Sequence, residues 1–220
     1  METKAILIDA SCAICVIIML ALAIYCLIDG GNMYEFNTGV SCAVFCLIPS
    51  LMLHLRIMKL PVWIAVIIHL AIFLHAVGVM TYAYDEISFY DIVTHTYSSF
   101  VISMCAVLTL MCLQVYNAHI QFTVGVYAIF IVLVMISFGV LWEVFEYMID
   151  QLFVGTHMQY SPLDTIRDML SNTVGSIMCS AFIAVYMRRR SIDDLIESIE
   201  LHRYLRRFLG DKSSKKKSSD

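Results

Sequence analysis

The apolar residues of this chain come in long runs, and these runs constrain its fold more than any motif does. A helix needs roughly 20 apolar residues to cross a hydrocarbon core of about 30 Å. Runs of this length occupy nearly everything before Arg188 in the 220-residue chain. Only 15% of the residues are charged, against about a quarter in soluble domains. We therefore expect an integral membrane protein without a separate soluble domain.

Turn and charge signals divide the apolar sequence into six predicted membrane helices. The run Asp29-Gly30-Gly31-Asn32 marks a turn, and Pro61 stands where a helix tolerates proline. The first apolar run continues to Ile28, so we expect a retained helix and not a signal peptide. The fold class is thus all-α, a polytopic membrane helical bundle of about six transmembrane helices. The predicted helices cover about residues 5–28, 38–55, 61–82, 90–113, 122–149 and 163–187.

Lysine and arginine are distributed unevenly over the predicted loops. With six spans both termini share one side, and every basic residue except Arg167 falls on it. The positive-inside rule assigns that side to the cytoplasm, so we expect a multi-pass plasma-membrane protein with both termini cytoplasmic. We divide the chain into a transmembrane domain, 1–188, and a cytoplasmic amphipathic helix with a basic tail, 189–220. That segment either lies on membrane lipid or is solvated. The net charge of -4 gives no indication of nucleic-acid binding.

The cysteines are a weaker feature of the sequence. Cys12-Ala-Ile-Cys15 has the spacing of a metal or redox pair. It lies within an apolar run, as do the other six of the eight cysteines. We therefore expect them to be small packing residues.

Ionisable residues within the predicted spans form three groups. Such residues cost at least about 2.5 kcal/mol each near a helix centre, so they usually serve a function or a pairing. Asp91 and His95 share one face at the start of the fourth helix. Steps of three and four residues place further polar groups on single stripes of the fifth and sixth helices. These are Glu143, Glu146 and Asp150, and then Asp164, Asp168 and Asn172, with Arg167 on the flank. The predicted topology brings all three groups to the outer side.

These clustered carboxylates cannot all stay ionised without compensating charge. Either some of them are protonated because their pKa values are raised, or cations neutralise them. A bound divalent ion is the most economical cation, and oxygen ligands with one histidine suit Mg²⁺, Ca²⁺, Mn²⁺ or Zn²⁺. A structural polar network is the alternative, in which the aspartates at the helix starts only complement the helix dipole. The predicted metal ligands are Asp91, His95, Glu143, Glu146, Asp150, Asp164 and Asp168.

Three motifs together resemble those of a known family. In order and spacing they look like the YjdF-type inner-membrane proteins of bacteria and archaea, and more distantly like VanZ-like proteins linked to glycopeptide resistance. VanZ-like proteins commonly have lysine where Ile92 stands and glutamine where Glu146 stands, which favours the YjdF type. The resemblance covers about residues 85–185 and implies a small polytopic cell-envelope protein, without naming a reaction. The motifs are Asp91-x-x-x-His95, Gly139-x-x-Trp142-Glu143-x-x-Glu146 and Asp168-x-x-x-Asn172-x-x-Gly175.

Three functions fit this sequence. The first is a metal-dependent membrane hydrolase or transferase acting on a lipid or polyprenyl phosphate at the outer leaflet. Its predicted catalytic residues are His95, Glu143 and Asp168, and its substrate-binding residues are Arg167 and Asn172. The second is a non-catalytic, metal-stabilised membrane or binding protein. The third is a proton- or cation-coupled transporter, against which the absence of an inverted repeat counts.

Overall fold

The computed structural model describes residues 2–31, 33–117, 119–152, 158–159 and 161–209, and most of them are helical. Six candidate membrane spans, long and apolar enough to cross a bilayer, lie in these ranges. This confirms the predicted polytopic helical bundle. The helices that form the spans are α1 (Glu2–Ile28), α2 (Met33–Cys46) with α3 (Ile48–His54), α4 (Val62–Met80), α6 (Tyr90–Tyr116), α7 (Val124–Leu152) and α8 (Pro162–Arg189).

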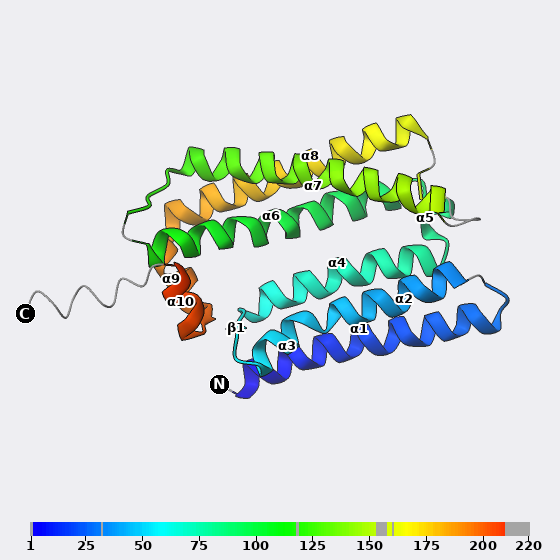
Figure 1. Cartoon of the computed structure of the whole chain (residues 1–220), viewed down its shortest axis with the longest axis horizontal. Helices are drawn as coiled ribbons and strands as arrows, with labels where there is room; N and C mark the ends of the chain where they lie inside the picture. The colour runs from blue at the N-terminus through cyan, green and yellow to red at the C-terminus, as the bar shows by residue number, and fades with distance from the viewer. Residues whose placement is uncertain (1, 32, 118, 153–157, 160, 210–220) are drawn as a thin grey trace, which may run out of the picture.

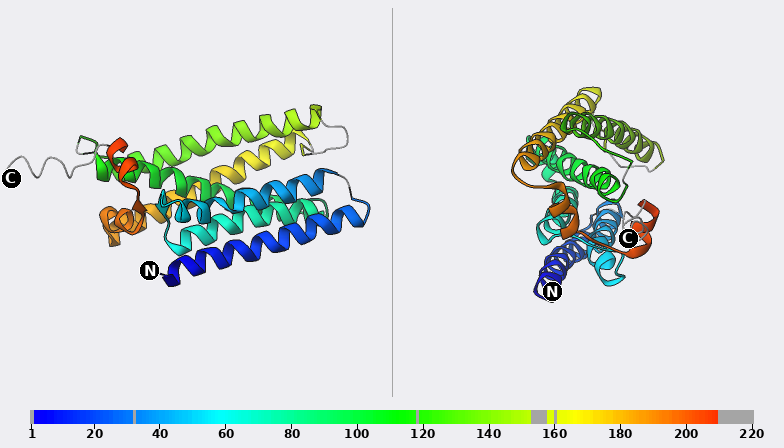
Figure 2. Two further views of the ribbon diagram at one scale, coloured as in Figure 1. Left: turned by 60° about the horizontal axis from the view of Figure 1, so that its bottom comes forward. Right: turned by 90° about the vertical axis from the view of Figure 1, so that its left-hand side faces the viewer.

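The long helices pack as two groups of three. Helices α1, α2 and α4 form one group, α6, α7 and α8 form the other, and α4 lies against α6 between them (Figures 1 and 2). The first group buries small and sulfur-containing side chains, among them Ala23, Cys46 and Ala76. The second buries larger ones, among them Met104, Tyr127 and Ile183. Small residues let membrane helices approach closely, which suits the first group.

The second span differs from the continuous helix that the sequence predicts over 38–55. Helix α2 ends at Cys46, and α3 begins at Ile48 with Pro49 in its first turn. Proline has no N–H to donate and its ring clashes with a preceding carbonyl group, so it starts a helix better than it continues one. The break therefore lies just before Pro49, as this chemistry requires.

The two ends of the bundle carry different short elements. One end, which we call the α5 end, holds α5 (Ala83–Glu86) in the connection from α4 to α6 (Figure 1). The opposite end, the terminal end, holds the start of α1 together with α9 (Ile192–Ser198) and α10 (Arg203–Leu209). There β1 (Met58–Lys59) pairs antiparallel with β2 (Glu200–Leu201). The side of the membrane on which each end lies stays a prediction from the basic residues.

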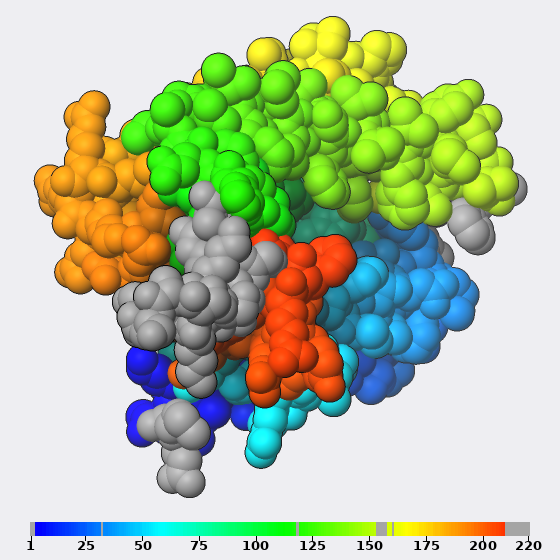
Figure 3. All heavy atoms as spheres, turned by 60° about the vertical axis from the view of Figure 1, so that its left-hand side comes forward, coloured from blue at the N-terminus to red at the C-terminus, as the bar shows by residue number. Residues whose placement is uncertain are grey.

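The segment after α8 is not one amphipathic helix. It is divided into α9, β2 and α10, and its apolar residues Ile196 and Ile199 are fully buried against the bundle. Figure 3 shows α10 at the terminal end, between the two helix groups. The guanidinium of Arg206 lies over the ring of Tyr116, 5.6 Å from its centroid. The predicted apolar face is thus covered largely by protein, while the basic tail, 210–220, lies outside the described residues.

Candidate functional site

Two of the predicted polar groups meet at the α5 end, where α6 and α8 both begin. Asp91 and His95 stand one turn apart on α6, and Asp168 lies opposite on α8. Nε2 of His95 is 3.3 Å from Oδ1 of Asp91 and 3.9 Å from Oδ1 of Asp168. The three residues offer ligand atoms that all lie within 4.8 Å of one another. We call Asp91, His95 and Asp168 the acidic cluster.

Asn172 and Ser99 fix the orientation of the imidazole. Nδ1 of His95 lies 3.4 Å from Oδ1 of Asn172, and the hydroxyl of Ser99 donates to the same oxygen at 2.5 Å. An amide oxygen only accepts hydrogen bonds, so Nδ1 of His95 is the donor. Nε2 therefore faces the two aspartates, as it does in metal sites whose histidine is oriented by an outer partner.

Two glycines allow this close assembly. A Cβ atom at Gly175 would overlap the carbonyl oxygen of Thr96 and lie 2.9 Å from Cβ of Ser99, so the backbones of α8 and α6 touch here. A Cβ atom at Gly139 of α7 would lie 3.1 Å from Nδ2 of Asn172. Each glycine thus leaves room for a neighbouring helix, and Gly175 brings Asp168 and Asn172 up to His95.

Glu143 and Glu146 bring further buried carboxylates to the same end of the bundle. Glu143 is 7% exposed and Glu146 is 8% exposed, and both interact electrostatically with His95. Oε1 of Glu146 accepts a hydrogen bond of 2.7 Å from Nε1 of Trp142. Both oxygens of Glu143 are buried without a hydrogen-bond partner among the described residues, as is Oδ1 of Asp168. The region therefore holds more carboxyl groups than the single imidazole of His95 pairs with in the described chain.

Besides Glu143, Glu146 and Asn172, three further predicted site residues lie outside the acidic cluster. The carboxylate of Asp150 accepts the backbone N–H groups of Met158 and Gln159 at 2.9 Å each. Asp164 belongs to the first turn of α8 and is not in the group whose ligand atoms converge. Arg167 is exposed on α8. The structure thus brings together fewer ligands than the seven predicted.

Comparison with known proteins places the whole bundle in one family. Residues 11–189 match a family of predicted membrane proteins designated DUF2238. The chain belongs to this family. The match runs from α1 to the end of α8, so it includes the acidic cluster and both buried glutamates. No curated protein and no solved structure matches the chain.

In this DUF2238 protein His75 lies beside the site, although it is not one of the predicted site residues. It lies on α4, in the other helix group, and interacts electrostatically with His95 and Asp91. Its Nδ1 is 3.0 Å from the hydroxyl of Tyr84, and its ring packs edge-on against Trp142 at 5.8 Å between centroids. The signal in the sequence was its depth in the span, which matches that of the acidic residues, and no local spacing pointed to it.

Tyr84 makes the stability of the folded chain depend on alkaline pH. It lies on α5, outside the spans, and burial raises the pKa of its phenol above the ordinary value. The native chain keeps this proton at a pH where the unfolded chain has released it. The stability that depends on the neutral phenol is therefore complete below the unfolded pKa of about 10 and is lost as the pH rises above it.

We expect a Tyr84→Phe variant to lose part of this alkaline destabilisation. Between about pH 9 and pH 11 its melting temperature should fall less steeply than that of the wild type, because the titrating group is gone. Tyr204→Phe, which changes an exposed ring of α10, is the matched control and should follow the wild-type curve. Identical curves for the wild type and Tyr84→Phe would contradict the prediction.

An apolar groove lies on another face of α6 in the DUF2238 bundle. It has a volume of about 410 Å³ and lies along α6 and α8. None of its lining residues belongs to the acidic cluster, and helical spacing turns Asp91 and His95 to a different face of α6. The lining residues are Ile92, Val93, Thr96, Tyr97, Phe100 and Met178. An acyl or prenyl chain matches this apolar surface.

Proposed function

We propose that this DUF2238 protein binds a divalent cation between Asp91, His95 and Asp168 and acts there on the phosphate group of a membrane lipid. The observation that carries this proposal is the buried carboxyl group of Glu143 without a hydrogen-bond partner, beside two aspartates that share the single imidazole of His95. Among the described residues, no ion pair joins a lysine or arginine to these carboxylates. Uncompensated buried charge is expensive, and a cation supplies the missing partner.

The donor set limits the choice of metal. Two carboxylates and one imidazole form a mixed oxygen and nitrogen site, which favours Mn²⁺ or Zn²⁺ over Mg²⁺ and Ca²⁺. Three protein ligands leave further coordination positions for substrate, as in catalytic metal sites and unlike closed structural ones. Asn172 and Ser99 keep the imidazole aimed at this position. In this proposal Asn172 is therefore a positioning residue for His95, and its predicted contact with substrate is not needed.

The groove supports a lipid as the substrate. Its apolar lining along α6 and α8 would hold an acyl or prenyl chain. A divalent ion there supplies polarisation of a phosphoryl oxygen. Glu143 is then placed to accept the proton of an attacking water or hydroxyl group, since both its oxygens are unpaired. Arg167, exposed near the start of α8, would contact the phosphate from the membrane surface. This chemistry is hydrolysis or transfer of the phosphoryl group.

The same geometry bears on the alternatives. A metal that joins α6 to α8 would also stabilise the bundle without catalysis, and this is the second reading of the acidic cluster. Transport fits less well, because the described core between the cluster and the terminal end is mainly apolar, with Met104, Val107 and Met111 fully buried there. Placement of the cluster at the outer leaflet of the plasma membrane, and kinship with YjdF-type or VanZ-like proteins, belong to the proposal.

An Asp168→Asn variant tests the metal site. The purified full chain, stripped with EDTA, should bind about one Mn²⁺ when free Mn²⁺ is followed by electron paramagnetic resonance. Asp168→Asn should weaken this binding at least about tenfold, because it removes one of two charged ligands. Asp164→Asn, one turn away on α8 and outside the cluster, is the matched control and should bind like the wild type.

Two results would count against the proposal in different ways. A wild-type chain that binds no divalent ion, or an Asp168→Asn chain that binds like the wild type, would overturn the metal site. Mn²⁺ binding without phosphate release or transfer from phosphatidate or polyprenyl phosphate in mixed vesicles would instead leave the non-catalytic alternative. The two measurements therefore separate the site from the reaction.

A further inference from the structure

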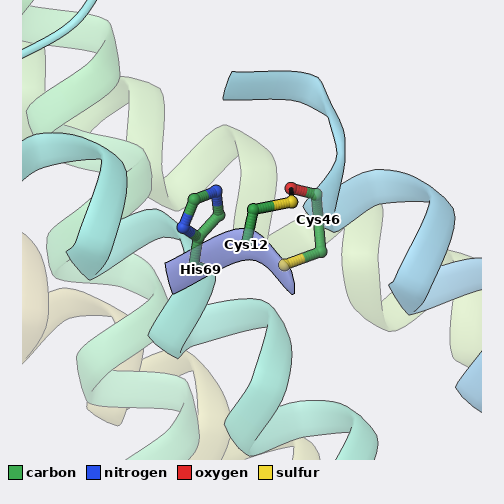
Figure 4. A group of neighbouring side chains, drawn as sticks. All are labelled: Cys12, Cys46 and His69. Atoms are coloured by element: carbon green, nitrogen blue, oxygen red, sulfur yellow. Dashed lines mark hydrogen bonds between the residues drawn. The ribbon is translucent and has the colours of Figure 1, made fainter. Parts of the chain in front are cut away.

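A second group of metal-ligating side chains lies in the other helix group, where no predicted site residue falls. It consists of Cys12 on α1, Cys46 on α2 and His69 on α4, which are 3%, 0% and 1% exposed. Their ligand atoms all lie within 4.8 Å of one another. Figure 4 shows the three side chains reaching from three helices toward one another. The sequence prediction that the cysteines only fill space does not account for a histidine buried between two of them.

The hydrogen bonds of His69 leave one ring nitrogen ready to bind a metal. Nδ1 of His69 is 2.8 Å from Oγ of Ser11, and the Ser11 hydroxyl donates its one hydrogen to the carbonyl of Ile8 at 2.9 Å. Ser11 must therefore accept from Nδ1–H, which places the lone pair of the neutral ring on Nε2. Nε2 is buried and has no hydrogen-bond partner in the described chain. A buried, unpaired imidazole nitrogen beside two thiols is an acceptor without a donor.

We propose that Cys12, Cys46 and His69 form a binding site for a thiophilic divalent ion of the Zn²⁺ class, separate from the acidic cluster. Sulfur and imidazole ligands are the set that Zn²⁺ prefers in proteins. Binding converts both thiols to thiolates and releases two protons to the solvent. Two thiolates and one neutral imidazole balance the two charges of the ion, so the complete site is neutral, as a membrane interior requires.

The surrounding chain offers what such a site still needs. A tetrahedral Zn²⁺ places two sulfur ligands about 3.8 Å apart, so the present separations need only small side-chain rotations. Cys15, one turn along α1 and partly buried, interacts with the Cys46 side chain, so a third thiol lies beside the site. Cys46 is the last residue of α2, next to the break before α3, where the backbone adjusts more easily than inside a helix.

The site would act as a staple for the first helix group. It joins α1, α2 and α4, which otherwise meet mainly through small apolar side chains.

Cobalt tests this inference without needing any variant to fold. The purified full chain, reduced and free of metal, should take up Co²⁺ with the near-ultraviolet sulfur-to-cobalt charge-transfer absorption that only thiolate ligands give. Zn²⁺ should displace the cobalt and abolish the absorption, because the same ligands prefer Zn²⁺. The acidic cluster has no sulfur, so binding there produces no such band. A wild-type chain that shows no thiolate band at equimolar Co²⁺ would overturn the inference.

Variants then assign the ligands. Cys46→Ala and Cys12→Ala should each lose most of the band, and Ser11→Ala should weaken Co²⁺ binding about tenfold by releasing the His69 ring. Cys42→Ala, which changes a buried cysteine of α2 one turn from Cys46, is the matched control and should keep the wild-type band. Asp168→Asn should also keep it, which separates this site from the acidic cluster. A band that survives the combined Cys12→Ala and Cys46→Ala change would contradict the assignment.

Discussion

A Glu143→Met variant should be more stable than the wild type when both are free of metal. Glu143 is 7% exposed and neither of its oxygens has a hydrogen-bond partner among the described residues. Methionine has a similar volume and carries no charge to desolvate. Replacing a buried ion pair by apolar residues of similar volume is neutral or stabilises proteins by about 1–4 kcal/mol, and a buried carboxyl group without a hydrogen-bond partner should respond in the same direction. The free energy of unfolding, measured in EDTA by denaturant titration of the detergent-solubilised chain, should rise within this range.

Glu146→Met is the matched control for this result. Glu146 lies one turn away at 8% exposure, but its Oε1 accepts the hydrogen bond from Nε1 of Trp142. The substitution leaves that donor unpaired, which costs about 1–3 kcal/mol and offsets the gain. We therefore expect Glu146→Met to be clearly less stable than Glu143→Met. If Glu143→Met instead loses stability, Glu143 has a stabilising partner in the metal-free protein and the argument from uncompensated charge fails.

Metal should reduce the difference in stability between the wild type and Glu143→Met. Divalent ion that binds only the native state stabilises it in proportion to its affinity. The wild type should gain stability on addition of Mn²⁺, whereas Glu143→Met should gain less because a neighbouring negative charge is missing. In a functional site we expect this pattern, in which one residue lowers the stability of the metal-free protein and strengthens the binding of ligand.

The membrane bundle could be predicted from sequence because span length and apolar composition are local properties. The described residues contain six candidate spans where the sequence predicts six helices. The break before Pro49 was missed because apolar composition continues across it, although the chemistry of proline is a local signal. The packing of Ile196 and Ile199 on the bundle could not be predicted, since an apolar helix face looks the same whether lipid or protein covers it.

The acidic cluster was predictable for a different reason. Helical spacing pairs Asp91 with His95, and the alternating direction of the spans brings Asp168 to the same end. The same spacing also included Asp150, whose carboxylate is taken by backbone N–H groups of the following connection. A stripe at steps of three and four residues covers a broad arc of a helix, so spacing alone does not say which members converge. Whether the assembled residues bind metal stays a prediction.

The cysteine site shows where sequence reasoning stops. Cys12, Cys46 and His69 come from three helices and have no shared spacing, so only the packing of α1, α2 and α4 brings them together. The local signal in the sequence, Cys12-x-x-Cys15, points to the right helix but does not include the histidine. Ligands contributed by separate helices are visible only once the helix crossings are known.

A Gly175→Ala variant should lose both stability and metal affinity. The new Cβ would overlap the carbonyl oxygen of Thr96, which is backbone and cannot rotate away, and would crowd Cβ of Ser99. Overpacking of this kind costs about 1–3 kcal/mol. Relief requires α8 to move away from α6, which increases the distance between Asp168 and His95. We therefore expect Mn²⁺ binding to weaken along with the free energy of unfolding.

Gly125→Ala separates the effect of helix contact from the effect of glycine itself. Its added Cβ would meet no other residue closer than Oγ1 of Thr123 at 3.8 Å, so it should be neutral or stabilise by up to about 1 kcal/mol. A Gly175→Ala chain as stable as Gly125→Ala would show that α8 and α6 do not touch at this point. If Gly175→Ala is unstable yet binds Mn²⁺ like the wild type, the cluster does not depend on the crossing of α6 and α8. Loss of both properties is expected only if that crossing holds the ligands together.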